Sequence, residues 1–267
     1  MDGICLTDCT LSEKNIRDNI VNKDLQKLKI FVYDMTDSTN TRAKEYYFSK
    51  KPVTPAVFIA NGQSAGRGRR GRSFDSAKGA GIYISFLVDG ELLASSQTLT
   101  VRCAVKCARA IESVTGLKVG IKWVNDLFVS GRKLCGILTE GEADAEGNGL
   151  RYAIVGIGIN LMKRDFPPPL CDIATTIEDE TGHVPDRSKL IGAVIDAFFE
   201  DECDSCVMEE YRKRSTVIGK QVTARRIGGG EFDCLVLGIS DSGELLVRRT
   251  DGTEETLISA EISILHK

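Results

Sequence analysis

The chain has 267 residues, of which 42% are hydrophobic, and a formal net charge of −3. This length allows one large domain or two ordinary ones, and the slightly acidic balance argues against a protein that covers nucleic acid with a broad basic face. No apolar run approaches the roughly 18 residues of a membrane helix, and the N-terminus lacks the basic and apolar regions of a signal peptide. We therefore expect a cytoplasmic protein that binds neither nucleic acid nor a membrane.

Nine cysteines occur in a chain that is large enough not to need disulfide bonds for stability. This usage predicts reduced thiols in a cytoplasm. Cys203 and Cys206 form a CxxC pair, but a structural zinc site needs four ligands. The two histidines, His183 and His266, lie near no pair of cysteines in the sequence. We expect no metal ion held by cysteine or histidine.

Short strands and helices alternate after a polar N-terminal stretch with a weak helical pattern. Helical spacing of apolar residues predicts one helix, which Gly116 would end. A cluster of cap-forming residues at 37–40 predicts the start of another helix. The predicted strands are 30–33, 56–60 and 82–88, and the predicted helices are 38–48 and 98–115.

Three further strands and one long helix are predicted in the middle of the chain. The strands are 119–129, 133–140 and 152–159, with Ser130 and Gly131 as the hairpin turn between the first two. The polar, acidic stretch 141–150 is typical of a surface loop. Apolar residues at helical spacing predict a single amphipathic helix over 186–211.

The pattern changes near residue 217 to short strands with glycine-containing turns, which is typical of a small SH3-like barrel. These strands are 221–226, 232–239, 245–249, 255–259 and 262–265. We therefore expect an α+β protein in three parts. Residues 1–27 form an extension, 28–215 a domain with a largely antiparallel mixed sheet flanked by helices, and 216–267 the barrel.

Residues 66–72 read Gly-Arg-Gly-Arg-Arg-Gly-Arg and concentrate positive charge in a loop. Glycine lets the backbone approach a ligand closely, and arginine matches the geometry of phosphate and carboxylate. The loop lies between two predicted strands, so it is neither a P-loop nor a dinucleotide fingerprint, which both need a following helix. It predicts a small anionic ligand, a contact to nucleic acid, or a solvated basic loop. Phe74 nearby can stack on a base or serve as a core aromatic.

A second cluster combines Asn125 and Asp126 with Lys133 across the predicted hairpin. The spacing brings a carboxylate and an ammonium group together, and a paired lysine stabilises phosphoryl oxygens well. Alone this indication is weak, because most such pairs are surface ion pairs worth under about 1 kcal/mol.

A third cluster is Gly156, Gly158 and Asn160 at the end of a predicted strand. Glycines inside a strand usually mark the close approach of a ligand or another backbone; a β-bulge is the alternative. Asn160 is placed to bind a ribose or a phosphate.

In order and approximate spacing, these clusters resemble those of biotin protein ligases over residues of about 30 to 265. The motifs that carry the resemblance are residues 37–40, 63–72, 122–126, 132–138, 156–160 and 259–263. Two positions depart from the family pattern: Val124 stands where proline is usual, and Phe74 where many members have a tryptophan that stacks on adenine. Family members that repress transcription carry an N-terminal winged helix, for which this chain has no room, so repression is not expected.

The resemblance implies a class II synthetase-like fold and two half-reactions. Biotin and ATP with Mg²⁺ form biotinoyl-5'-AMP, and a lysine of a biotin carboxyl carrier domain then takes the biotin. It also implies a monomer or a homodimer. A lipoate or octanoate ligase shares this chemistry but is not expected to carry the arginine loop. A nucleic-acid-binding protein is the alternative from a different class.

The resemblance further implies a role for each motif residue. Lys133, Arg67 and Asp126 are the implied catalytic residues, since Lys133 would stabilise charge at the α-phosphate and Asp126 would orient or deprotonate the incoming amine. Residues implied to bind biotin are Ser38, Thr39, Asn40, Gln63, Arg67, Gly68, Arg69, Lys133, Gly136 and Gly156. Residues implied to bind ATP or the adenylate are Arg69, Arg70, Arg72, Phe74, Lys122, Asn125, Lys133 and Asn160.

Overall fold

The structure is a computed structural model that describes residues 11–49, 54–90, 96–143 and 150–265. Its larger part contains, in chain order, α1 (Glu13–Arg17), η1 (Lys23–Lys27), β1 (Lys29–Thr36), α2 (Thr39–Tyr47), β2 (Ala56–Gln63), η2 (Arg69–Gly71), β3 (Gly81–Asp89), α3 (Ser96–Thr115), β4 (Gly120–Lys122), β5 (Asp126–Val129), β6 (Arg132–Ala143), β7 (Leu150–Asn160), η4 (Leu170–Asp172), α4 (Ile177–Thr181), α5 (Arg187–Phe199) and α6 (Asp204–Arg214). The first ten residues of the expected N-terminal extension, and His266, lie outside the described residues.

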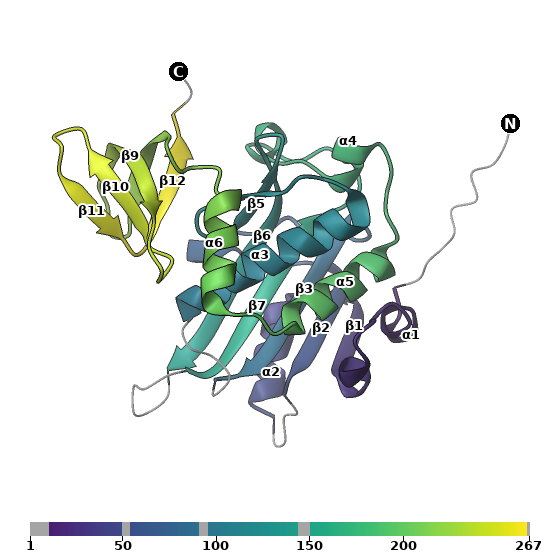
Figure 1. Cartoon of the computed structure of the whole chain (residues 1–267). Coiled ribbons are helices and arrows are strands. Elements are labelled where there is room, and N and C mark those ends of the chain that lie inside the picture. The colour runs from purple at the N-terminus through teal and green to yellow at the C-terminus, as the bar shows by residue number, and fades with distance from the viewer. Residues whose placement is uncertain (1–10, 50–53, 91–95, 144–149, 266–267) are drawn as a thin grey trace, which may run out of the picture.

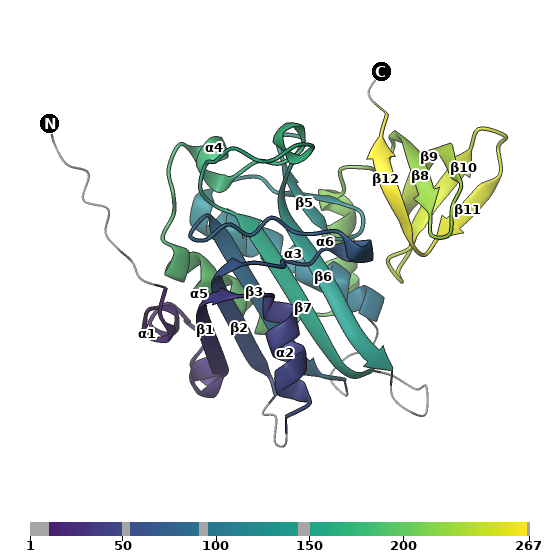
Figure 2. The same cartoon turned by 180° about the vertical axis from the view of Figure 1, so that it is seen from behind.

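Strands β1 to β7 form one mixed sheet with helices on both faces. Its strand order is β1-β2-β3-β7-β6-β5-β4; β1 and β2 are parallel, and the other neighbours are antiparallel. Helix α2 covers one face, while α3 lies across the other with α5 and α6 beside it (Figures 1 and 2). The expected fold class, a largely antiparallel mixed sheet flanked by helices, is confirmed.

The apolar face of α3 forms the centre of the main core. Val101, Ala104, Ala108 and Ile111 are fully buried against the sheet, as the helical spacing predicts. Gly116 follows with φ = +72°, the left-handed conformation that ends a helix at little cost for glycine. The pattern and the stop residue therefore fix the position of this helix.

The C-terminal part is a second sheet, drawn in yellow and set to one side of the first in Figure 1. Its strands are β8 (Gln221–Arg226), β9 (Glu231–Ile239), β10 (Leu245–Arg249), β11 (Glu254–Leu257) and β12 (Ala260–Ile264), in the antiparallel order β11-β10-β9-β8-β12. This is the predicted run of short strands. The described residues contain no ladder between β11 and β12, so the sheet is not closed into a barrel by strand pairing.

Two predicted elements are each divided in the structure. The strand predicted over 119–129 is two antiparallel strands, β4 and β5, joined by residues 123–125. The single helix predicted over 186–211 is α5 and α6, because Glu200 is extended and Cys203 starts a new helix by accepting the Cys206 amide at its side chain. Apolar spacing continued across both breaks, so periodicity alone did not show them.

The cysteines are only partly as predicted. Cys103 and Cys107 are buried thiols on α3, and burial raises the pKa of Cys103 to about 12. Cys203 and Cys206, in contrast, form a disulfide at the start of α6, so the expectation of reduced thiols is wrong for this pair. Within the described ranges, no helix combines the length and the apolar character needed to cross a membrane.

Candidate active site

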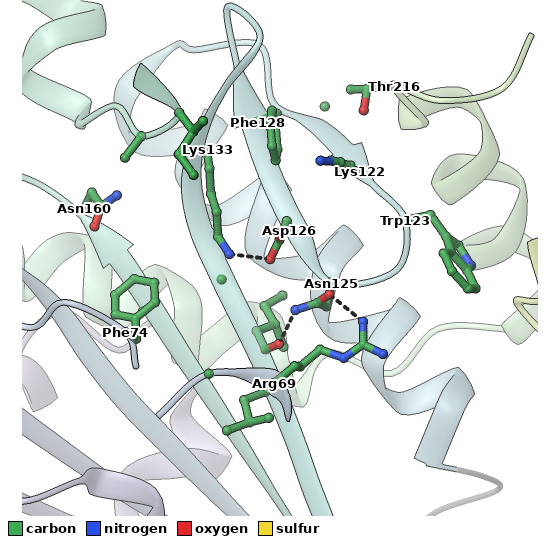
Figure 3. Close-up of a pocket in the computed structure, with 18 of the residues that line it drawn as sticks. Arg69, Phe74, Lys122, Trp123, Asn125, Asp126, Phe128, Lys133, Asn160 and Thr216 are labelled. Atoms are coloured by element: carbon green, nitrogen blue, oxygen red, sulfur yellow. Dashed lines mark hydrogen bonds and ion pairs between the residues drawn. The ribbon is translucent and has the colours of Figure 1, made fainter. Parts of the chain in front are cut away.

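The residues proposed from the sequence all line a cavity of about 1530 Å³ on the face of the sheet that carries α2 and the arginine loop. These are Ser38, Thr39, Asn40, Gln63, Arg67, Gly68, Arg69, Arg70, Arg72, Phe74, Lys122, Asn125, Asp126, Lys133, Gly136, Gly156 and Asn160. They come from segments far apart in the chain, which the sheet and its loops bring together (Figure 3). The cavity extends to β12 of the C-terminal sheet, where Glu261 also lines it.

One end of the cavity is a buried network of hydrogen-bonding groups at the start of α2, all neutral except the carboxylate of Glu140 at its edge. The amide and hydroxyl of Thr39 donate to Gln63 Oε1 at 2.8 and 3.1 Å. Ser85, in the middle of β3, donates its hydroxyl to Asn40 Oδ1 at 2.6 Å, and Asn40 Nδ2 donates to Glu140 at 2.8 Å. Thr39, Asn40 and Ser85 are each at most 3% exposed. Such fixed donors and acceptors suit an uncharged polar head group.

Glycines form the cavity wall next to this network. Gly136 on β6 and Gly158 on β7 are direct partners across the sheet, and the register around them is continuous, so a β-bulge is excluded here. A Cβ on Gly158 would lie 2.5 Å from the ring of Phe74, and one on Gly156 would lie 2.3 Å from Asn40 Oδ1. Glycine is therefore needed for close packing. The sequence pattern predicted the approach of a ligand or another backbone, whereas the groups that approach here are the side chains of Phe74 and Asn40.

Phe74 lies directly over these glycines. Its ring packs on Gly158 and Gly136 and makes an edge contact with Tyr83 at a centroid distance of 6.5 Å. One side of the ring therefore belongs to the wall of the cavity, and Figure 3 shows it on the same side as Asn160. Asn160 is 6% exposed and donates to the carbonyl of Thr175 at 3.1 Å.

The opposite wall carries the predicted pair of Lys133 and Asp126. Their Nζ and Oδ1 atoms are 2.7 Å apart across the β5–β6 hairpin (Figure 3), so the predicted proximity is confirmed. Burial lowers the pKa of Lys122 below its ordinary range, although the charge of Asp126 acts in the opposite direction. An anionic ligand that binds at this wall would therefore contact two lysines in a partly desolvated site.

Two arginines of the loop point toward the sheet. Arg67 forms an ion pair with Glu140 at 2.7 Å. Arg69 donates to Asn125 Oδ1 at 2.9 Å, and Asn125 Nδ2 donates to the carbonyl of Ile137 at 2.7 Å. Burial, with repulsion from the next arginine of the loop, lowers the pKa of Arg69. An anion that binds beside Arg69 would therefore stabilise the charge of its guanidinium group.

The other two arginines reach the C-terminal sheet. Arg70 and Arg72 both pair with Glu261 on β12. Burial alone would raise the pKa of Glu261, but the hydrogen bond from Arg72 and the charges of both arginines outweigh it and lower that pKa. The turn itself needs positive φ at Arg70 (59°) and Gly71 (73°). The loop arginines therefore connect the two sheets, because they pair with Glu140 on one sheet and with Glu261 on the other.

The sequence reasoning missed Glu140, Ser85 and Glu261. Glu140 follows Gly136 by four positions in the same strand, so the period of two places both on one face, and this signal was available. Ser85 stands alone in an apolar strand and is a buried polar residue that needs partners. Glu261 belongs to the motif at residues 259–263, but its contact with the loop depends on the packing of the two sheets, which the motif does not show.

Comparison of the chain with known protein families defines its class. Residues 32–160 match the Biotin/lipoate A/B protein ligase family, and residues 217–265 match the Biotin protein ligase C terminal domain. The first match leaves biotin and lipoate ligases as alternatives, and the second favours the biotin group.

Individual relatives agree with this assignment. The chain is 33% identical to the bifunctional ligase/repressor BirA of Bacillus subtilis over 95% of this chain and 79% of that protein. It is 29% identical to the biotin–[acetyl-CoA-carboxylase] ligase of Paracoccus denitrificans over 85% of this chain and 97% of that one. The biotin protein ligase of Aquifex aeolicus in complex with biotin and ATP is similar in structure, with a TM-score of 0.74 and 26% identity over 90% and 99% of the two chains. The chain belongs to the biotin protein ligase family.

Proposed function

We propose that this chain joins biotin to ATP and then transfers the biotin to a lysine of a biotin carboxyl carrier domain. One observation carries the proposal: one cavity combines a buried network that is neutral except for Glu140 with the lysines and arginines that line its walls. This arrangement suits a ligand with an uncharged polar head and a carboxylate that must approach a triphosphate. Two anions repel each other in water, so a site that fixes both and supplies positive charge lowers the barrier.

In the first half-reaction, an oxygen of the biotin carboxylate attacks the α-phosphorus of ATP. The bond from this phosphorus to the bridging oxygen breaks, and pyrophosphate leaves with the electron pair. The proposed biotin head-group site is the network of Thr39, Asn40 and Gln63. Lys133 stabilises charge on the α-phosphate, and Arg67 and Arg69 hold the carboxylate and phosphates.

In the second half-reaction, the lysine amine of the carrier attacks the acyl carbon of the anhydride. AMP leaves with the electrons of the broken C–O bond, and the amine loses a proton. Asp126 is the proposed group that orients this amine or accepts the proton, because its carboxylate lines the cavity beside Lys133. Phe74 and Asn160 are proposed to contact the nucleoside.

The residues present fit a magnesium ion that arrives on ATP. The described residues contain no cluster of three His, Cys, Asp or Glu side chains that could hold a resident metal. Mg²⁺ on a triphosphate needs one or two protein carboxylates at most and keeps several waters, and Asp126 is a carboxylate within the cavity. When bound, the ion would neutralise phosphate charge and assist the departure of pyrophosphate.

The direct test is ATP–pyrophosphate exchange with and without biotin, followed by transfer of labelled biotin to a carrier domain. Exchange that requires biotin is expected; exchange without biotin, or none at all, would refute the adenylation step. Thermal shift gives an independent check, because a ligand at 100 times its Kd stabilises the folded state by about 2.7 kcal/mol. Octanoate and lipoate, tested in place of biotin, address the related ligase class.

The carrier partner, the oligomeric state and the absence of repression stay predictions. Light scattering with and without biotin and ATP distinguishes a monomer from a homodimer. Binding to generic duplex DNA at moderate salt, insensitive to biotin, would favour the nucleic-acid alternative. Labelling of a carrier domain in which the target lysine is changed to arginine would contradict the predicted acceptor.

A further inference from the structure

Lys122 ends β4 and Asp126 begins β5, and both line the cavity. The joining segment, residues 123–125, lies outside both strands and adds Trp123 and Asn125 to the cavity wall. The backbone of this segment is linked to the sheet where the carbonyl of Asn125 accepts the amide of Ile137 at 3.0 Å. Lys122 and Asp126 are partners in the β4–β5 ladder. The position of Asn125, and the path of the chain between the two strand ends, therefore depend on what else fixes residues 123 and 124.

Two buried hydrogen bonds fix these residues from the side away from Lys133. Trp123 Nε1 donates to the carbonyl of Gly243 at 2.8 Å, in the turn between β9 and β10 of the C-terminal sheet. The hydroxyl of Tyr211, on α6, donates to the carbonyl of Val124 at 2.9 Å. Figure 3 shows Trp123 turned away from Lys133 and Asp126. Neither bond involves a residue proposed to touch a ligand.

The side chain of Tyr211 is buried at this position. Its side chain is 1% exposed, and burial strongly raises the pKa of the phenol, with Arg69 and Asp126 as the charged neighbours that influence it. The hydroxyl therefore remains a protonated donor at every physiological pH. Its hydrogen bond to the carbonyl of Val124 places the hydroxyl one residue before Asn125, which lines the cavity.

The two hydrogen bonds come from parts that are joined to each other. Arg212, the next residue on α6, donates to the carbonyl of Ile239 at 2.8 Å and pairs with Asp241. Ile239 ends β9, and Asp241 lies in the same β9–β10 turn that presents Gly243. Helix α6 and the C-terminal sheet therefore hold residues 123 and 124 as one unit.

We propose that Tyr211 is a positioning residue for adenylation, acting through the carbonyl of Val124 together with the bond from Trp123 to the C-terminal sheet. The inference rests on the proposed function and extends it: the C-terminal sheet and α6 fix the lysine and carboxylate wall of the cavity. A small displacement of these groups is costly, because in-line attack needs reacting groups held to a fraction of an ångström.

The alternative is that Tyr211 contributes only to core packing. Tyr211→Phe keeps the ring and removes the hydroxyl, which leaves the Val124 carbonyl buried without its donor. A positioning role predicts a fall of roughly 10- to 100-fold in kcat for biotin-dependent ATP–pyrophosphate exchange, with the Kd for biotin changed by less than about twofold. It also predicts faster amide hydrogen exchange in a peptide that covers residues 122–127.

The matched control is Ile195→Val, which removes one buried methylene from α5, outside the cavity, and costs a comparable amount of stability. It should leave both readouts unchanged. A Tyr211→Phe variant with control-like kcat and unaltered exchange at 122–127 would overturn the positioning role. If the unaltered chain shows no biotin-dependent pyrophosphate exchange, the proposed function fails, and the amide-exchange comparison still decides whether Tyr211 orders the segment.

Discussion

The arginine loop at residues 66–72 and the hairpin at residues 122–138 bring positive charge to the same cavity in different ways. The hairpin is part of the sheet, and Lys133 pairs with Asp126 from neighbouring strands. The backbone bonds of the loop close it on itself, with Gly68 donating to Arg72 at 2.8 Å and Phe74 to Gly66 at 2.9 Å, and arginine side chains link it to other parts of the chain. Arg67 and Arg72 are 47% and 66% exposed, and their partners are Glu140 and Glu261 from other parts of the chain.

This difference indicates which charges a ligand can recruit. Exposed ion pairs are worth under about 1 kcal/mol each, so a carboxylate or a phosphate can replace Glu140 or Glu261 at little cost. The hairpin pair is fixed by backbone ladders and does not need the ligand to form. We infer that the hairpin is preorganised and that the loop changes its partners when an anionic ligand binds.

Removal of the Lys133 charge is expected to have the largest effect. Lys133→Ala takes away the fixed cation of the hairpin and should reduce biotin-dependent ATP–pyrophosphate exchange by roughly 10²- to 10³-fold. Lys78→Ala is the matched control, because it breaks an ion pair of the same length, 2.7 Å to Asp34, away from the cavity. A near-normal exchange rate in Lys133→Ala would remove this residue from catalysis.

The loop should respond differently. Arg67→Ala should leave the fold intact and release the adenylate from the protein roughly 10-fold faster, a change of about 1.4 kcal/mol, because the loop loses one contact to the ligand. Retention of labelled adenylate on gel filtration measures this. Arg225→Ala, which breaks an exposed pair with Glu231 on the C-terminal sheet, is the control. Equal retention in both variants would contradict a closing role for the loop.

The wall of glycines offers a third test, with an intermediate effect. A Cβ at Gly158 would meet the ring of Phe74 at 2.5 Å, so Gly158→Ala should displace that ring and destabilise the protein by about 1–3 kcal/mol. Adding Phe74→Leu should recover part of the loss. Gly238→Ala, where the nearest atom to the new Cβ is 3.9 Å away, is the control in urea titrations. A Gly158→Ala variant as stable as this control would show that the ring moves freely.

The sequence predicts the site better than it predicts the chain path through it. Glycine and arginine in residues 66–72, and the seven-residue separation of Asp126 and Lys133, are local signals. The four arginines, Gly68, Asp126 and Lys133 all line the cavity. The break at 123–125 was not predicted, because apolar residues continue across it, and it is held by Tyr211 and by the C-terminal sheet. Contacts between distant elements leave no periodic pattern.

The same reasoning applies to the helices. Periodicity gave α3 correctly, because its stripe and its stop residue agree. Periodicity joined α5 and α6 into one helix, although the acidic stretch before Cys203 and the cap at that residue divide them. This break matters for the site, since it sets the position of Tyr211 on α6.

The contact of the loop with Glu261 should give the smallest effect and a defined pH dependence. Because pairing with Arg72 and Arg70 holds the pKa of Glu261 below its ordinary value in the folded protein, the contact stabilises the protein above the unfolded pKa, about 4.3. The contribution is lost as the pH falls through the lower folded value. Glu261→Gln should therefore lower the free energy of unfolding at pH 7 by under about 1 kcal/mol.

The difference between Glu261→Gln and the unaltered chain should shrink below about pH 4, because the wild-type carboxylate is then protonated too. Glu254→Gln, which breaks an exposed pair with Arg248 on the same sheet, controls for the general effect of losing a carboxylate. Saturating ATP with magnesium should also reduce the difference for Glu261→Gln, because phosphates then replace Glu261 as partners of the loop. A difference that is constant with pH and with ATP would mean that other contacts hold the loop to the C-terminal sheet. The loop and the hairpin would then differ only in the exposure of their charged side chains.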